Sequence, residues 1–261
     1  MKLSIAIPTY NSSSFITDCL DSIRKNKFVN EIIINDDCSN KDDYSSLKNT
    51  VRKYESKYNL DISISQNKSN LGGFKNKYIC IQKCSNEFVY QIDSDNLVGK
   101  NLKFIIDKNK FNRNTFYLPS TVYVFKKNPY LSSYMKKYKV NISNKDTLLN
   151  KDIVSKSLID HTQLFIDVKN RWLFNLGNFI VQKDMFLNNM STPFKSKDLP
   201  LAADPIAMCY FWLKKGGDIK IVKDFYHFHR LRQESYWNSA GERAVSSVSY
   251  FEKKLMELSD D

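Results

Sequence analysis

Glycine and proline are scarce in this chain, whose 261 residues include only seven glycines and six prolines. Such scarcity excludes collagen-like and linker-rich proteins, while a hydrophobic content of 42% is enough to form a large core. Long apolar runs are also missing, since the stretch from Ile206 to Leu213 falls well short of the roughly 18 residues that a bilayer requires. The sequence therefore predicts one globular domain over residues 1–261, with no segment that crosses a membrane.

The N-terminus lacks the features of a signal peptide. Residues 1–5 lead directly into a strand-like segment, without a long apolar region or a cleavage site of small residues. Cysteine is too sparse for a disulfide framework or a zinc site, and the close pair Cys80 and Cys84 is interpreted as core residues on one helix face. These observations favour a cytoplasmic protein with reduced thiols.

Acidic residues are outnumbered by basic ones, which gives a formal net charge of +12. A basic surface attracts nucleic acids, anionic lipids or anionic small molecules without selecting among them. No zinc-finger spacing or RNA-binding run supports a nucleic-acid partner, so none is expected. Peripheral contact with an anionic membrane stays open as an alternative to simply solvated lysines.

Short apolar segments alternate with helical patterns over the first hundred residues. Strands are expected at four segments, which are 2–8, 31–34, 61–65 and 87–92, and amphipathic helical spacing separates them. This alternation predicts an α/β fold with a mostly parallel central sheet flanked by helices. Polar clusters follow each strand, and ligands bind at the carboxyl ends of such strands. An active site is therefore expected along this edge.

The second half has weaker patterns. Strands are expected at 116–125 and 218–222, and helices at 203–213 and 243–258. The segment from Lys126 to Asp160 is polar and rich in lysine and asparagine, and it is interpreted as loop.

Four motifs occur in a specific order, each after an expected strand. They are Pro8-Thr9-Tyr10-Asn11, Asp36-Asp37-Cys38-Ser39, Asn70-Leu71-Gly72-Gly73 and Asp93-Ser94-Asp95. This order resembles that of the family 2 glycosyltransferases with the GT-A fold, closely over residues 1–100 and more weakly through Asp204 and residues 226–230. The resemblance implies a Rossmann-like nucleotide-sugar-binding half (1–100), an acceptor-binding half (101–240) and a C-terminal helix (241–261). Two positions depart from the family pattern, namely Cys38 in place of glycine and Ala203 before Asp204.

The resemblance implies a metal-dependent transfer from a nucleoside-diphosphate sugar, with a UDP-sugar favoured, to a hydroxyl of a glycan, lipid or protein. Mn²⁺ or Mg²⁺ prefers oxygen ligands and would neutralise the leaving diphosphate. Asp95 is expected to be the more direct metal ligand, and Asp93 to contact the ribose or the metal. An Asx-rich turn with two solvated carboxylates is the alternative. A metal-binding histidine is expected at His229, with His227 as the competing ligand.

The remaining roles also follow from the resemblance. Asp37, beside Asp36, would accept a hydrogen bond from the base, while Pro8, Thr9, Tyr10 and Asn11 would line the nucleoside. Donor contacts are further expected at several positions, which are Asn70, Gly72, Gly73, Asp93, Ser94, Arg230 and Arg232. Lys75 or Lys77 would reach a phosphate. Arg230 and Arg232, together with Ser235 and Tyr236, would form a flexible clamp over the phosphates of the donor. Trp172 and Trp237 would stack on sugars or lie in the core.

Asp204 begins an apolar helix, where the family's general base lies, and Asp198 is the fallback. An inverting transfer needs a carboxylate within hydrogen-bond reach of the acceptor hydroxyl. A carboxylate favoured by the helix dipole is the simpler alternative. Two rival functions remain, a sugar nucleotidyltransferase and a noncatalytic carbohydrate- or polyanion-binding module on the same fold.

Overall fold

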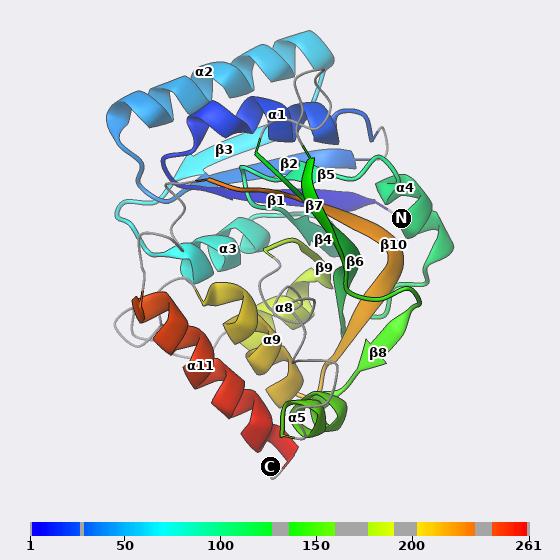
Figure 1. Cartoon of the computed structure of the whole chain (residues 1–261). Helices are drawn as coiled ribbons and strands as arrows, with labels where there is room; N and C mark the ends of the chain where they lie inside the picture. The colour runs from blue at the N-terminus through cyan, green and yellow to red at the C-terminus, as the bar shows by residue number, and fades with distance from the viewer. Residues whose placement is uncertain are drawn as a thin grey trace.

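The computed structural model describes residues 2–26, 29–126, 136–159, 177–190, 203–232 and 242–259. Its first hundred residues alternate strands with helices, as the sequence predicts (Figure 1). The elements are β1 (Leu3–Thr9), α1 (Ser13–Ile23), β2 (Val29–Asp36), α2 (Lys41–Tyr58), β3 (Ile62–Gln66), α3 (Gly73–Gln82) and β4 (Phe88–Gln91). All seven residues of β1 are buried, which explains why its centre, Ile5 to Ile7, is apolar without alternation, because an interior parallel strand is covered on both faces.

The later elements add antiparallel strands and further helices. They are β5 (Leu97–Val98), α4 (Leu102–Lys108), β6 (Thr115–Phe125), β7 (Lys136–Asn141), β8 (Thr147–Leu149), α5 (Lys151–Ile159), β9 (Phe179–Gln182), α8 (Lys183–Met190), α9 (Asp204–Lys214), β10 (Asp218–Arg230), α11 (Glu242–Met256) and the 3₁₀ turn η1 (Glu257–Ser259). Several of these elements were not predicted from the sequence. Strand β10 is also longer than the predicted strand at 218–222, since it continues to Arg230.

One mixed sheet of ten strands runs through the described part of the chain, in the order β3-β2-β1-β4-β9-β6-β10-β5, with β7 beside β6 and β8 beside β10. The first four strands are mutually parallel, as are β6 and β10. Strand β9 lies antiparallel between β4 and β6 and so joins the two halves of the sheet. The predicted α/β fold is confirmed, and its parallel pairing is concentrated in the N-terminal half.

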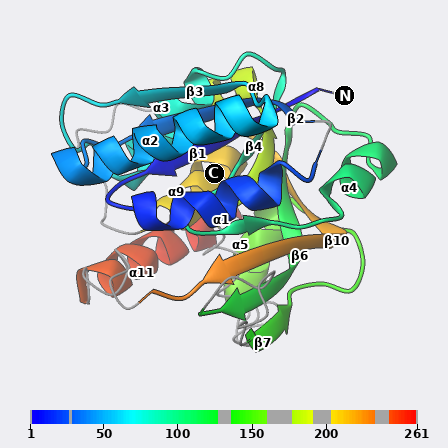
Figure 2. The same cartoon turned by 90° about the horizontal axis from the view of Figure 1, so that it is seen from above.

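Helices cover both faces of the sheet. Figures 1 and 2 show α1 and α2 on one face and α3, α8 and α9 on the other, with α11 outside α9. Two apolar clusters match this division, since α1, α2 and α4 pack into one of them, and α3, α9 and α11 into the other. Cys80 and Cys84 are buried in the second cluster as free thiols, as predicted, but Cys84 follows the end of α3 and does not lie on its face. No helix in the described ranges is both long and apolar enough to span a bilayer.

The interpretation of residues 126–160 as loop is wrong for its described part. Residues 136–159 form β7, β8 and α5. Strand β7 pairs with β6 alone among the described strands, and its lysines are tolerated because an edge strand has one unpaired side. The polar composition that suggested loop therefore marks the rim of the sheet.

Cys38 shows that the second motif does need an unusual backbone. The departure from glycine would be mild without a positive φ, but Cys38 has a φ of 63°. A side chain in this left-handed region costs about 1–2 kcal/mol, and glycine avoids that cost. The chain therefore carries local strain beside Asp37.

Replacing Cys38 with glycine is expected to raise the free energy of unfolding by roughly 0.5–1 kcal/mol, because relief of the strain exceeds glycine's extra entropy in the unfolded chain. Urea unfolding of C38G and the parent would measure the change. Cys38→Ala is the matched control, since it removes the thiol but keeps the strained φ, and it should show no gain. Equal stabilisation by both substitutions would contradict this explanation.

Candidate functional site

Asp36 and its neighbours form a buried structural cluster at the end of β2. The Asp36 carboxylate accepts hydrogen bonds from Thr9 Oγ1 (3.1 Å), from Ser39 N and Oγ (2.9 and 2.6 Å) and from Gln66 Nε2 (2.9 Å). Four donors stabilise a fully buried carboxylate and hold the loops after β1, β2 and β3 together. Asp36 therefore has a structural role, in which it holds the loops that carry the site in place.

Asp37 organises the loop that precedes α3. Its carboxylate accepts hydrogen bonds from Leu71 N (2.9 Å), Gly72 N (2.8 Å) and Asn67 Nδ2 (2.8 Å). Gly72 has a φ of 84°, so the glycine here is required by the backbone. Asn70 Oδ1 also accepts from Gly72 N (3.2 Å). The second and third sequence motifs therefore meet as one unit.

The motif after β1 contributes one exposed aromatic ring. Tyr10 is 47% exposed, whereas Thr9 is buried and its carbonyl accepts from Asn76 Nδ2 (3.2 Å). Pro8 is also buried within β1. Asn11 N donates to Ser39 Oγ (2.7 Å), which ties the ends of β1 and β2 together. Tyr10 is therefore the member of this motif best exposed for contact with a planar ligand.

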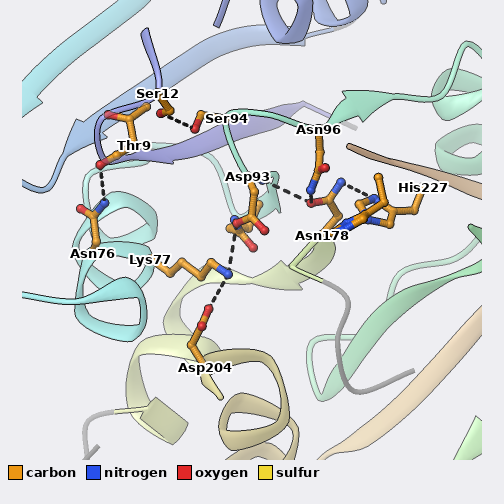
Figure 3. Close-up of polar contacts among 12 residues, drawn as sticks. Thr9, Ser12, Asn76, Lys77, Asp93, Ser94, Asn96, Asn178, Asp204 and His227 are labelled. Carbon is orange, nitrogen blue, oxygen red and sulfur yellow. Dashed lines mark hydrogen bonds and ion pairs between the residues drawn. The ribbon is translucent and has the colours of Figure 1, made fainter. Parts of the chain in front are cut away.

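Lys77 connects Asp93 with Asp204. Its Nζ lies 2.5 Å from Asp204 Oδ2 and 3.1 Å from Asp93 Oδ1 (Figure 3). The three residues come from α3, from the turn after β4 and from the start of α9, and the figure shows the ammonium group between the two carboxylates. Asp93 and Asp204, for which the sequence predicts separate roles as metal ligand and general base, thus share the buried ammonium group of Lys77.

The charges of this triad perturb one another. Burial alone would lower the pKa of Lys77, but the carboxylates of Asp204 and Asp93 outweigh it and raise that pKa well above its ordinary value. Desolvation raises the pKa of Asp93, with Asp95 and Asp204 adding to the rise and Lys77 opposing it. Perturbed groups of this kind mark candidate functional sites.

Two glycines let backbone approach these carboxylates. A Cβ added to Gly177 would lie 1.8 Å from Asp93 Oδ2, and one added to Gly73 would lie 3.4 Å from Asp204 Oδ1. Gly177 thus tolerates no side chain while Asp93 keeps its position. Gly73 is also the first residue of α3, and its predicted contact with the donor stays a prediction.

Asp95 is paired with the end of β10. Arg232 Nε lies 2.7 Å from Asp95 Oδ2, and Arg230 Nε donates to the Asp95 carbonyl (2.9 Å). Arg230 also binds Asp18 (2.6 Å) and lies over the ring of Phe15. These contacts favour a structural role for Arg230, which holds the turn that carries Asp95. Of the two arginines, Arg232 is the better placed for a ligand.

Ser94 and the amide of Asn178 fix the remainder of that turn. Ser94 Oγ lies 2.7 Å from Ser12 Oγ. Asn178 Oδ1 accepts from Asp93 N (3.2 Å) and from Asn96 Nδ2 (3.4 Å), and its Nδ2 contacts His227 Nδ1 (2.6 Å; Figure 3). His227 Nε2 in turn lies 3.4 Å from His229 Nδ1. Burial lowers the pKa of both histidines, most strongly for His227.

The carboxylates suit a divalent cation that a ligand helps to bind. Among the described residues, no group of three or more histidine, cysteine, aspartate or glutamate side chains is placed to hold a metal. Asp93 is partly exposed, at 32% of its side chain, and presents hard oxygen donors beside Asp95. Mn²⁺ and Mg²⁺ commonly take one or two carboxylates together with water and substrate phosphate. The donor set fits that pattern.

Some predicted site residues lie outside the described ranges, namely Trp172, Asp198, Ser235, Tyr236 and Trp237. The sequence interpretation missed Asn178 and Gly177, which precede the four-residue strand β9. It offered Lys75 or Lys77 for a phosphate and did not predict the contacts of Lys77 with Asp93 and Asp204. Gly177, just before an apolar run, was the available signal, since a glycine at a strand can mark close approach of the backbone to another group.

Comparison with protein families gives a match to the family described as Glycosyl transferase family 2, over residues 4–169. The chain is also 36% identical over 104 residues to the poly(ribitol-phosphate) beta-N-acetylglucosaminyltransferase TarS of Staphylococcus aureus. It is 34% identical over 102 residues to the poly(ribitol-phosphate) beta-glucosyltransferase of Bacillus spizizenii. Each match covers 38% of this chain, but only 17% and 16% of the two relatives.

Solved structures with similar folds extend over almost the whole chain. TarS of S. aureus, as residues 1–349 with UDP-GlcNAc, matches 97% of this chain and 66% of its own length, with a TM-score of 0.62 and 19% identity. A mannosyltransferase from Pyrobaculum calidifontis, in complex with GDP-Man and Mn²⁺, covers 98% of this chain and 69% of its own length, with a TM-score of 0.57 and 13% identity. These likenesses confirm the GT-A fold.

Proposed function

Because this chain belongs to glycosyl transferase family 2, we propose that it transfers a sugar from a nucleoside-diphosphate donor to an acceptor hydroxyl, with inversion at the anomeric carbon. The observation that carries the proposal is the meeting of Asp93, Lys77 and Asp204 at the carboxyl ends of the parallel strands. Ligands of open α/β sheets bind at this edge. The proposal includes the division of the domain into residues 1–100, which would bind the donor, and residues 101–240, which would bind the acceptor.

The nucleoside would lie over the motifs that follow β1 and β2. The exposed ring of Tyr10 suits stacking on a base. The Asp37 carboxylate, which is 3% exposed, would accept a hydrogen bond from a base N–H at the surface that Tyr10 adjoins. Both Asp37 oxygens already accept from the loop before α3, and from the residues that the structure describes Oδ2 accepts only the Gly72 N–H. A carboxylate oxygen has two lone pairs, so Oδ2 keeps capacity for a base. A UDP-sugar is the favoured donor.

Asp95, with Asp93 beside it, would hold Mn²⁺ or Mg²⁺ together with the donor diphosphate. When bound, the cation would neutralise charge that develops on the leaving diphosphate. Arg232 would contribute a second positive charge through a group suited to phosphate recognition. The partial exposure of Asp93 supports this assignment, since a ligand can reach it.

Asp204 would deprotonate the acceptor hydroxyl. Lys77 binds its Oδ2, and among the described residues no hydrogen-bond donor contacts Oδ1, which lies near Gly73. The ion pair therefore fixes the carboxylate while one oxygen keeps the capacity to accept a proton. Lys77 acts as a positioning residue here.

The acceptor would be an anionic glycan or polyol-phosphate chain. The net charge of +12 favours association with a polyanion, and the curated relatives act on poly(ribitol-phosphate). The chain spans only 17% and 16% of those relatives. The acceptor class is therefore proposed from the net charge and the sequence similarity together.

Thermal unfolding with nucleoside diphosphates, in the presence and absence of Mn²⁺ or Mg²⁺, would test the donor site. A ligand at about 100 times its Kd should stabilise by about 2.7 kcal/mol, and we expect a metal-dependent shift with UDP that Asp95→Asn removes. Hydrolysis of UDP-sugars would then be measured with the same preparation. Pyrophosphate release from a nucleoside triphosphate would favour the nucleotidyltransferase instead. No nucleotide shift and no hydrolysis would favour the noncatalytic module.

A further inference from the structure

We infer that Asn178 and His227 fix His229 as a neutral imidazole with its proton on Nε2, so that His229 donates to an anionic oxygen instead of binding the metal. The oxygen would be a phosphate oxygen of the donor or the neighbouring Asp95 carboxylate. The inference rests on the proposed donor site, but its test does not depend on turnover. It departs from the metal-binding role expected for His229 from the sequence.

The orientation of the Asn178 amide is set by a backbone donor. Asp93 N can only donate, and it lies 3.2 Å from one end of the Asn178 side chain, which must therefore be the oxygen. Asn96 Nδ2 approaches the same oxygen at 3.4 Å. The other end of the amide, which lies 2.6 Å from His227 Nδ1, is consequently the NH₂ group.

This NH₂ group determines the tautomer of His227. An N–H donor cannot face another N–H, so His227 Nδ1 must carry a lone pair, and the ring proton lies on Nε2. His227 is fully buried, which also disfavours the charged imidazolium. His227 therefore has no lone pair to offer a metal at Nε2, and its Nδ1 is occupied by Asn178.

The same reasoning continues to His229. The protonated Nε2 of His227 lies 3.4 Å from His229 Nδ1, which must accept. A neutral His229 then carries its own proton on Nε2. The turn that carries Asp95 lies beside the same end of β10, where Arg230 Nε donates to the Asp95 carbonyl (2.9 Å), so the Asp95 carboxylate is an oxygen anion in this part of the site. The contact with His227 therefore leaves the Nε2 proton as the hydrogen-bond donor of the neutral His229 ring.

Metal binding through His229 Nε2 would require the reverse arrangement. The proton would have to lie on Nδ1 and be donated to His227 Nε2, which would then place a proton on His227 Nδ1 against the Asn178 NH₂ group. Metal-bound histidines usually donate their second N–H to a carboxylate or carbonyl oxygen. Asn178 cannot supply that oxygen without losing the bond from Asp93 N.

Imidazole ¹⁵N NMR would read the tautomers directly in the protein without ligands. The chain has three histidines, and His161→Gln, His227→Gln and His229→Gln would assign their signals. We expect His227 and His229 both to be protonated at Nε2 in the parent. A proton on Nδ1 of His229 would overturn the inference, whatever the outcome of the donor-binding experiment.

Asn178→Asp is the sharpest variant, since it replaces the NH₂ group with an acceptor of the same shape. Its carboxylate should draw a proton to His227 Nδ1, and both histidines should then switch to the Nδ1-protonated tautomer. Histidine signals unchanged in a folded N178D protein would contradict the proposed chain.

Mn²⁺ affinity in the presence of UDP, followed by electron paramagnetic resonance of the free ion, supplies the second readout. His229→Gln retains an N–H donor and should change the Kd of Mn²⁺ less than about threefold, whereas loss of a metal-binding partner commonly costs about 10–100-fold. A loss above tenfold in H229Q would overturn the inference. In N178D the affinity should rise, and the double variant N178D/H229Q should lose that gain.

Discussion

Asp204→Asn is expected to reduce sugar transfer about a thousandfold, within the 10²–10⁴ that a general base typically contributes. Asparagine keeps the size and one oxygen of the side chain but cannot take the proton of the acceptor hydroxyl. Lys77 would still be bound to Asp93, at 3.1 Å, so the site should keep its shape. Initial rates at saturating donor and acceptor would measure the loss.

Asp198→Asn is the matched control for this experiment, because Asp198 is the other carboxylate that the sequence offers as a base. It should keep nearly full turnover. Binding of UDP should be unchanged in both variants, since Asp204 lies at the start of α9 and not in the motifs that follow β1 and β2. A loss of less than tenfold in D204N, or a large loss in D198N, would remove Asp204 from the proposed role.

The fold of the first hundred residues could be predicted from the sequence because its geometry is local. Each of the first strands is an apolar run followed by a polar motif, and parallel pairing brings the ends of such strands to one edge. The positions of Asp37 and Asp93 at this edge are predicted in this way, and their roles stay predictions. The contacts of Asp37 with residues 67–72 follow from the same alignment, since β2 and β3 are neighbours.

The contacts that complete the site are distant in sequence. Lys77 meets Asp204 across 127 positions, and Asn178 meets Asp93 across 85. The hydrophobic periodicity of the sequence does not predict such pairs. They depend on the insertion of β9 between β4 and β6 and on the packing of α9 against α3. A buried lysine also resembles its solvated neighbours in a chain with 40 basic residues.

The backbone at Cys38 was unpredictable for a different reason. Glycine is the usual sign of a positive φ, and the sequence has cysteine at that position. Four hydrogen bonds to Asp36 and three to Asp37 outweigh the strain of one residue, so tertiary contacts override the local preference. The local preference of cysteine therefore does not predict the backbone at this position, because the hydrogen bonds of Asp36 and Asp37 determine it.

Lys77→Met is expected to lower the free energy of unfolding by about 3 kcal/mol, because it leaves Asp204 and Asp93 without their shared cation. Removing one partner of a buried ion pair costs about 3–5 kcal/mol, and the partial exposure of Asp93 argues for the low end. Methionine retains the apolar stem of lysine, so lost packing contributes little. Urea unfolding monitored by far-UV circular dichroism would give the difference.

Lys75→Met is the matched control, since it makes the same change on the same helix. Lys75 forms no ion pair with a described residue and is only partly buried, so its replacement should cost less than about 0.5 kcal/mol. If Lys77 instead served a donor phosphate, as one sequence interpretation held, K77M would weaken UDP binding with little loss of stability. A large destabilisation in K77M, with none in K75M, would instead show that the ion pairs of Lys77 with Asp204 and Asp93 stabilise the fold.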